Sequence, residues 1–285
     1  MMDVILDTLI DAVKLLPFLF VTYLLMEYVE HKAGDSFAKA LHKGGAVGPL
    51  FGGVLGAVPQ CGFSAAASNL YAGRVISIGT LFAVYLSTSD EMLPILISER
   101  TDIRLIIKIL AIKAVIGIVI GFLVDLCLRL MGRFSQEWDI ESLCEREHCS
   151  CEDEEGIIKP ALVHTIHVFL FVIAITFVIN IIVHFAGLEA IRGSMMGRPV
   201  VGELIAALIG LIPNCGASVA LTQLYIDGVI SIGAMLAGLL TGAGVGLLVL
   251  FRVNDHLKEN LIIAGLLYVF GAVCGIVIEL SGVAI

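Results

Sequence analysis

The sequence predicts an all-α, polytopic membrane protein that contains two internally repeated units, each with one broken helical segment. Three observations predict this fold class. The chain has 285 residues, of which 59% are hydrophobic and 15% charged, and its mean hydropathy is +1.01, well above that of a soluble domain of this size. It contains several apolar stretches of membrane-spanning length, and its two halves align with one another.

Six apolar stretches are long enough to cross a hydrocarbon core of about 30 Å, and we expect each to form one spanning helix. Two further stretches, 46–73 and 200–226, are interrupted. The first spanning stretch carries Asp3, Asp7 and Asp11 and lacks a basic region and a cleavage site, so we expect a retained helix rather than a signal peptide. The six stretches are 4–30, 76–98, 103–131, 160–187, 229–251 and 260–283.

The internal repeat appears when the sequence is shifted by 154 residues, which aligns the two halves without a gap. GAVPQCGFSAAASNLYAGRVISIG, which begins at Gly56, then falls on GLIPNCGASVALTQLYIDGVISIG, which begins at Gly210. Self-similarity at a fixed offset predicts two copies of one structural unit. Each unit then comprises a spanning helix, an interrupted segment and two further spanning helices.

The interrupted segments are broken at matching places. Pro59 removes a backbone donor and Gly62 frees the backbone, so a helix is not expected to run through Pro-Gln-Cys-Gly, and the same holds at Pro213 and Gly216. Backbone polar groups freed at membrane depth persist only where protein or a wet cavity surrounds them. Paired broken segments in the two halves are typical of a transporter's binding site.

Small residues precede the first break at a regular spacing. Gly48, Gly52 and Gly56 recur every four residues, and small residues at this spacing let two helices approach closely. We therefore expect these glycines to serve packing.

Two topologies fit these segments. If the interrupted segments are re-entrant hairpins, each half crosses three times and the halves are inverted; if they cross fully, each half has four spans and the halves are parallel. The distribution of Lys and Arg favours neither. Inverted topology places the loop between the halves in the cytoplasm, where its three closely spaced cysteines are more easily kept reduced, so we prefer it.

The chain divides into a first membrane repeat (1–132), an acidic loop (133–158) and a second membrane repeat (159–285). The formal charge of −9 comes largely from this loop, and no basic run suggests nucleic-acid binding. The loop contains metal-ligand residue types, although their spacing matches no zinc-finger pattern, and we expect transient metal capture or sensing there. The alternative is a solvated acidic linker. The candidate ligands are Cys144, His148, Cys149 and Cys151.

The broken segments supply the first candidates for a substrate site. Cys61 and Cys215 are the only cysteines that recur between the halves, and each follows an amide, Gln60 or Asn214. Thiolates suit soft ions such as arsenite, zinc or copper, whereas manganese prefers oxygen ligands. Buried cysteine also serves as a small apolar residue. Possible oxygen ligands on the same segments, which also have a packing interpretation, are Ser64, Asn69, Ser218 and Gln223.

The second candidates are Asp90 and Glu91, inside the stretch 76–98 that we expect to be one helix. An acid at mid-helix costs roughly 2.5 to 3.5 kcal/mol on insertion scales, which is tolerated where the group faces a cavity or a partner. One alternative is a structural pair with Lys113 on the next helix. Because Gly244 and Val245 occupy the matching positions of the second half, any carboxylate site is asymmetric.

The paired motifs VPQCGFSAAASNLYAGRVISIGTLFAVYLSTSDEMLPIL and IPNCGASVALTQLYIDGVISIGAMLAG resemble the bacterial ten-transmembrane heavy-metal or manganese exporter family, which is distantly similar to arsenical permeases. The likeness covers nearly the whole chain. It implies efflux of a metal or metalloid ion, such as a heavy metal, manganese or an arsenical, across the cell inner (plasma) membrane.

We therefore expect a transporter that works by alternating access, not an enzyme, with the lipid bilayer, a metal or metalloid ion and coupled protons as its partners. No resident cofactor is required, and a homo-oligomer is compatible with the sequence. No Walker A motif occurs, so an ion gradient or the membrane potential would supply the energy. The alternatives are a passive ion channel and a membrane thiol-disulfide oxidoreductase.

Overall fold

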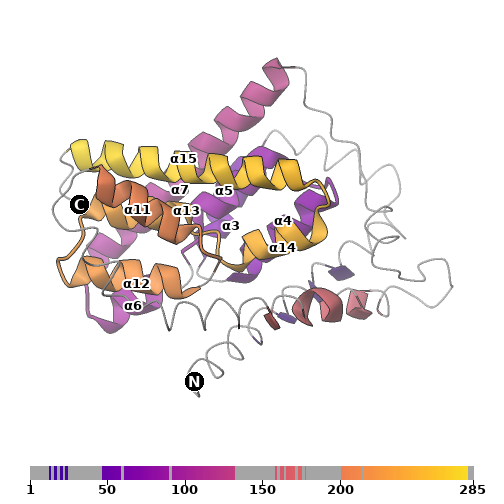
Figure 1. The fold of residues 1–285 in the computed structure, drawn as a ribbon, viewed down its shortest axis with the longest axis horizontal. Helices are drawn as coiled ribbons and strands as arrows, with labels where there is room; N and C mark the ends of the chain where they lie inside the picture. The colour runs from indigo at the N-terminus through magenta and orange to yellow at the C-terminus, as the bar shows by residue number, and fades with distance from the viewer. Residues whose placement is uncertain are drawn as a thin grey trace.

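The computed structural model describes residues 47–58, 61–89, 92–131, 200–213 and 215–281, together with scattered residues within 13–24 and 158–177. Across these residues all regular secondary structure is helical (Figure 1). This confirms the all-α class.

The first half contributes five described helices. They are α3 (Gly48–Gly56), α4 (Cys61–Ala72), α5 (Ile78–Ser87), α6 (Met92–Ser98) and α7 (Ile103–Leu130).

The second half contributes another five helices, and their lengths are similar to those of the first five, taken in chain order. They are α11 (Val201–Gly210), α12 (Cys215–Ile226), α13 (Ile232–Thr241), α14 (Val245–Val253) and α15 (Leu257–Leu280). The first residues of α4, α5 and α7 lie 154 positions before those of α12, α13 and α15.

Helix capping recurs at the same offset. The Ser77 hydroxyl caps α5 by accepting from the Thr80 amide (3.1 Å), and the Ser231 hydroxyl caps α13 by accepting from the Ala234 amide (3.2 Å). An acidic side chain from a long helix also binds the first turn of each of these helices. On α7, the Asp125 carboxylate accepts from the Gly79 amide of α5 (2.9 Å). The Glu279 carboxylate accepts from the amide of Gly233 in the same way (3.1 Å).

Three segments of the described chain are long and apolar enough to cross a membrane: Ile103–Leu130, Leu257–Leu280, and α13 with α14, Ile232–Val253. Polar and apolar residues are distributed on α7 as lipid requires. Lys113 and Asp125 are buried against the protein, while Val115, Val119 and Leu123 are exposed, a pattern repeated by the outward apolar side chains of α15. The chain is a multi-pass membrane protein.

Glycines set the packing inside each half. A Cβ on Gly121 would meet the Gly79 carbonyl and one on Gly117 the Ala83 carbonyl, so α7 runs antiparallel to α5 at close range. Gly48 faces Thr80 and Gly56 faces Ser87, so α3 runs parallel to α5. The predicted packing role of Gly48, Gly52 and Gly56 is confirmed.

Each half packs one short helix against the other half. In Figure 1 α4 of the first half lies beside α14 of the second, and α12 lies beside α6. On the α4 side Ser68 donates to the Gly246 carbonyl (2.6 Å), and Tyr85 donates to the same oxygen (3.2 Å). On the α12 side Leu221 and Leu224 pack into one buried cluster with Met92 and Leu96.

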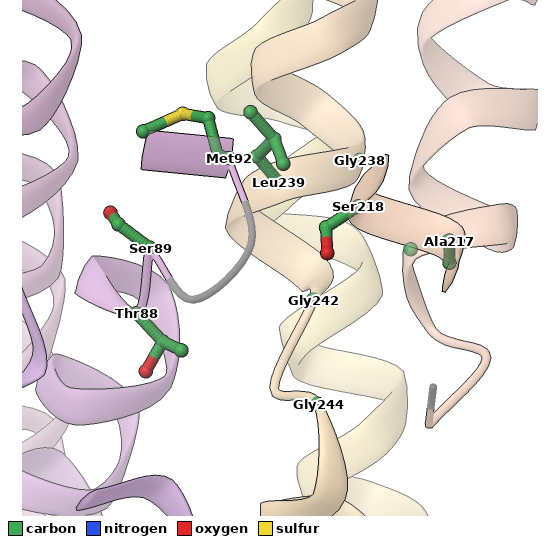
Figure 2. Close-up of a pocket in the computed structure, with 10 residues that line it drawn as sticks. Thr88, Ser89, Met92, Ala217, Ser218, Gly238, Leu239, Gly242 and Gly244 are labelled. Atoms are coloured by element: carbon green, nitrogen blue, oxygen red, sulfur yellow. The ribbon is translucent and has the colours of Figure 1, made fainter. Parts of the chain in front are cut away.

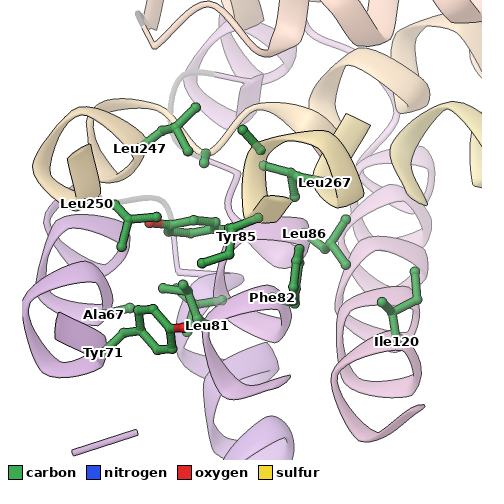
Figure 3. Packing of buried hydrophobic residues seen from close by; sticks show 14 of the residues in the cluster. Ala67, Tyr71, Leu81, Phe82, Tyr85, Leu86, Ile120, Leu247, Leu250 and Leu267 are labelled. Carbon is green, nitrogen blue, oxygen red and sulfur yellow. The ribbon is translucent and has the colours of Figure 1, made fainter. Parts of the chain in front are cut away.

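Helix α5 contributes to the largest apolar cluster among the described residues. Figure 3 shows Phe82, Tyr85 and Leu86 of α5 packed among side chains of α4, α7, α14 and α15. Phe82 meets Phe270 of α15 edge-on, with ring centroids 5.5 Å apart. The cluster contains residues of both halves, so the halves pack against each other through it.

The prediction of one unbroken helix over 76–98 is wrong, as is that over 229–251. Helix α5 ends at Ser87, because Thr88 turns extended (ψ 130°) and its hydroxyl donates back to the Val84 carbonyl (2.7 Å). Helix α13 ends at Thr241 and α14 starts at Val245 after Gly244, whose φ of 54° suits glycine. Side-chain hydroxyls that donate to carbonyls of their own helix compete with the backbone hydrogen bonds that would continue it. A hydropathy pattern does not predict this effect.

Candidate functional site

A pocket lies where three interruptions of the helices meet. Figure 2 shows Thr88 and Ser89 on one side, and Ser218, Gly242 and Gly244 on the other. The first pair follows α5, Ser218 is in the first turn of α12, and the two glycines separate α13 from α14. Among the residues that the structure describes, the lining comprises Thr88, Ser89, Met92, Gly210, Ala217, Ser218, Gly238, Leu239, Gly242 and Gly244.

Helix ends of both polarities converge on this pocket. Helices α5 and α13 end there, so their last carbonyl groups lack a partner within the helix and carry partial negative charge. Helices α6, α12 and α14 begin close by, with amide groups free of intrahelical bonds by the same geometry. The backbone itself therefore supplies polar groups for a small solute at membrane depth.

Lys113 reaches the pocket wall from the middle of α7. Its side chain is fully buried (0% exposed), and the ammonium donates to the carbonyl oxygens of Thr88 and of Leu239, the latter at 2.8 Å. Both acceptors belong to residues that line the pocket, one from each half. A positive charge is thereby placed where two helices end.

Hydroxyl groups fix the helix ends around the pocket. The Thr241 hydroxyl lies 2.9 Å from the carbonyls of both Ala207 and Gly238, which ties the end of α13 to α11. The Ser87 hydroxyl, at the matching position of α5, donates to the Ala83 carbonyl (2.7 Å). Ser89 donates to the Ser87 carbonyl (3.0 Å). The backbone that forms the pocket is held on both sides.

The candidate oxygen ligands lie at different places. Ser218 lines the pocket. Ser64, its counterpart, is buried in α4 against Gly246 of α14. Asn69 accepts a hydrogen bond from the Tyr23 hydroxyl (2.9 Å), and Gln223 donates to Asp227 in the turn that follows α12 (3.2 Å). The structure thus brings Ser218 to the pocket and places Asn69 and Gln223 in other contacts.

Several candidates lie outside the described residues. Asp90 and Glu91 do, but they follow Ser89 and precede Met92, which both line the pocket. Cys61 and Cys215 are the first residues of α4 and α12, and their side chains are not described. Also outside are Gln60, Asn214 and the loop candidates Cys144, His148, Cys149 and Cys151.

No group of three His, Cys, Asp or Glu side chains that could hold a metal ion occurs among the residues that the structure describes. The described part of the pocket offers hydroxyl and carbonyl oxygens, the Met92 thioether and a lysine beside it.

Sequence reasoning missed Thr88, Leu239, Gly242 and Gly244 as pocket residues, and treated Lys113 only as a pairing partner. A signal was present in part: Gly242-Ala243-Gly244 places three small residues in succession within an apolar run. Ser87-Thr88-Ser89 stands near the matching place in the first half. The contact of Lys113 with Leu239 had no such signal, because 126 positions separate the two residues.

Comparison with known proteins yields one family match. The family model described as "Putative, 10TM heavy-metal exporter" matches residues 1–186, more than half of the chain. The comparisons with curated proteins and with solved structures found no match.

Proposed function

This chain belongs to the ten-transmembrane heavy-metal exporter family, and we propose that it exports a metal or metalloid ion across the cell inner (plasma) membrane by alternating access. The observation that carries the proposal is the pocket at which interrupted helices of both halves meet beside a buried lysine. Binding sites of secondary transporters are typically built from discontinuous helices where two related halves of the protein meet.

The proposal includes an internal repeat of two units. The matching helix starts, the capping hydroxyls of Ser77 and Ser231, and the acids Asp125 and Glu279 on the long helices all recur at one offset. The contact of α4 with α14 and the contact of α12 with α6 are counterparts, as a twofold relation of two such units would produce. A solute site between two related units can be opened to either side by the same rocking motion.

We further propose that α3 with α4, and α11 with α12, are re-entrant hairpins. Helices α3 and α4 contain 9 and 12 residues, which correspond to about 14 and 18 Å, too short to cross a core of about 30 Å. Because α3 runs parallel to α5, the chain turns back within α4 before α5 begins. Hairpins of this kind leave three crossings in each half, an odd number, so the halves are inverted.

Transport by the purified full chain in proteoliposomes tests the function. Mn²⁺, Zn²⁺, Cd²⁺ and arsenite would be supplied one at a time, with an imposed proton gradient and without one. We expect one of these ions to accumulate against its own gradient when the proton gradient is present. Movement that only dissipates the ion gradient would identify a passive channel, and no movement of any ion would refute the proposal. A trapped mixed disulfide through Cys149 or Cys151 would instead indicate thiol-disulfide oxidoreductase activity.

A further inference from the structure

The two short helices that pack against the opposite half do so differently, and this difference leads to an inference about the transport cycle. The inference rests on the proposed function and its internal repeat. We propose that the contact of α4 with α14 is a closed gate of the transporter, held by groups that the matching contact of α12 with α6 lacks. This gate opens when the transported ion passes between the pocket and that face of the membrane.

Helix α4 approaches α14 closely at a glycine. A Cβ added at Gly246 would lie 2.7 Å from the Cβ of Ser64 and 2.8 Å from its carbonyl group, so a side chain at this position would separate the two helices. Met92 stands 154 positions before Gly246, at the start of α6. Because methionine has the side chain that glycine lacks, α12 cannot approach α6 in the same way. The pocket lies on that side, where Met92 and Ser218 line it.

Two hydroxyl groups hold the gate at this glycine. The Gly246 carbonyl oxygen lies 2.6 Å from the Ser68 hydroxyl of α4 and 3.2 Å from the Tyr85 hydroxyl of α5. The two hydroxyl oxygens are 2.7 Å apart, so one small network joins α4, α5 and α14. Figure 3 shows the Tyr85 side chain extending towards Leu250 of α14. A buried carbonyl that loses such partners costs free energy, so these hydrogen bonds favour the closed gate.

An ion pair holds the far end of α4. The Arg74 guanidinium, in the turn after α4, contacts both carboxylate oxygens of Glu259 in the first turn of α15, at 2.8 and 3.0 Å. The Tyr71 hydroxyl donates to the same carboxylate. Arg74 has a left-handed backbone (φ 57°), a conformation that disfavours residues other than glycine and persists where surrounding contacts hold it. The ion pair is such a contact, and it joins the two halves.

The sequence does not repeat these groups on the other side. At the matching positions, 154 residues away, stand side chains without a hydroxyl or a charge: Leu239 for Tyr85, Gly228 for Arg74 and Leu105 for Glu259. The two contacts are therefore unequal by composition as well as by distance of approach. The α4 side is held closed, and the α12 side lacks an equivalent set of bonds.

The gate lies towards the face of the membrane at which α7 ends. Asp125, near the end of α7, accepts from the Gly79 amide near the start of α5. The turn that carries Arg74 directly precedes α5, so it lies at the same face. The acidic loop 133–158 follows α7 there, and inverted topology, which we prefer, places that loop in the cytoplasm. The α4 gate then closes the cytoplasmic side of the transporter.

Labelling of a buried reporter cysteine tests the gate in the solubilised full chain. Ala65 of α4 is fully buried in one cluster with Val245 and Val249 of α14, so Ala65→Cys should react with a maleimide only when α4 leaves α14. Mass spectrometry distinguishes residue 65 from the native cysteines. Two variants should open the gate: Tyr85→Phe, which removes only the hydroxyl, and Arg74→Gln, which keeps a non-glycine residue at position 74. Each should raise the labelling rate about fivefold, the factor that corresponds to a contact worth about 1 kcal/mol.

Two controls separate opening of the gate from loosening of the whole protein. Ala207→Cys places the reporter at a fully buried position among α11, α13 and α15, and its labelling should be the same with and without Tyr85→Phe or Arg74→Gln. Tyr225→Phe removes a hydroxyl from α12 at the position that matches Tyr71. It should leave the labelling of residue 65 unchanged.

An unchanged labelling rate at residue 65 in both variants would make α4 a fixed part of the core and overturn the inference. Equal acceleration at residues 65 and 207 would also overturn it, because the whole protein would then have loosened. If one variant does not fold, the other decides alone. Labelling requires no metal ion, so its result is independent of the proposed function.

A transport measurement checks that the gate takes part in the cycle. A maleimide attached at residue 65 should keep α4 from closing on α14, so labelled Ala65→Cys in proteoliposomes should stop moving the ion that the unlabelled variant moves. Mn²⁺, Zn²⁺, Cd²⁺ and arsenite serve as probes. Equal transport by the labelled and unlabelled protein would contradict the gate, whereas labelling that follows the predicted pattern without transport of any probe would contradict only the proposed function.

Discussion

Arg74 and Glu259 form a two-pronged ion pair that joins the turn after α4 to the first turn of α15. Their two N–O distances are 2.8 and 3.0 Å, and the Tyr71 hydroxyl donates to the same carboxylate. Hydrogen bonding to Glu259 raises the pKa of the Arg74 guanidinium above its usual value. Arg74 adopts a left-handed backbone conformation (φ 57°), and the matching residue of the second half is Gly228 (φ 69°). The pair therefore holds an unfavourable backbone position and links the two halves.

Removing either residue of this ion pair should lower the free energy of unfolding. The losses from the two single substitutions should add up to more than the loss in the double variant. Arg74→Gln and Glu259→Gln, alone and together, keep a non-glycine residue at position 74, so the backbone strain is unchanged. We expect a coupling energy of about 1 kcal/mol, the upper end for partly exposed pairs, because the contact is two-pronged. Thermal unfolding in detergent measures it through the double-mutant cycle. Additive losses would show that the two residues stabilise the protein separately.

A methyl group added at the pocket should impair transport without destabilising the fold. In Gly242→Ala the new Cβ would meet no neighbouring atom closer than 3.4 Å, so the methyl group fits and narrows the pocket. We expect a several-fold lower transport rate and an unchanged melting temperature.

Gly238→Ala is the matched control for that prediction. Its Cβ would lie 2.8 Å from the Ala206 carbonyl, and overpacking of this kind costs about 1 to 3 kcal/mol. This variant should lose thermal stability. A wild-type transport rate in Gly242→Ala would remove the pocket from the pathway.

Asp90 and Glu91 should differ in importance. They lie between two residues of the pocket wall, and adjacent side chains on a chain segment do not face the same way. Asp90→Asn and Glu91→Gln keep size and remove charge. One variant should be nearly silent, and the other should block export and flatten its dependence on pH, measured in vesicles at several pH values.

Asp102→Asn controls for the general loss of a carboxylate. Asp102 caps α7 through the Arg104 amide (2.9 Å), and asparagine retains that capping ability, so export should be unaffected. Full export with unchanged pH dependence in both Asp90→Asn and Glu91→Gln would remove these acids from the mechanism.

Cys61 and Cys215 should matter if the exported ion is soft. Each begins the helix that follows a predicted break, and α12 reaches the pocket within its first turn. Cys61→Ser and Cys215→Ser should each slow the transport of arsenite, Zn²⁺ or Cd²⁺ while expression stays normal. Cys127→Ser, at an exposed position of α7, should have no effect. Normal transport by the double variant would make the cysteines packing residues and favour manganese.

The acidic loop should tune metal response without forming the pathway. Replacing 144–151 with glycine and serine removes all four loop candidates and leaves the apolar stretches unchanged. We expect a modest change in the metal concentration that cells tolerate, with transport in vesicles retained. Complete loss of transport by a normally inserted protein would contradict this division.

Local patterns in the sequence predicted the helical membrane class and the packing role of Gly48, Gly52 and Gly56. These properties depend on hydropathy and on spacing along one helix, which a single segment already contains. The interruption near Pro59 could also be predicted from the sequence, because proline lacks a backbone N–H and has a fixed φ. The helix ends at Ser87 and Thr241 could not be predicted from the sequence, since a serine or threonine inside an apolar run is compatible with a continuous helix.

Only the tertiary structure decided which interruptions meet and which groups face them. The packing of the two halves places Ser218 across the pocket from Thr88, and it places Lys113 in contact with the Leu239 carbonyl. These contacts join residues more than a hundred positions apart, so no local propensity encodes them. They arise because polar groups at membrane depth have no water to bind, so the fold must bring each helix end to a partner elsewhere in the chain.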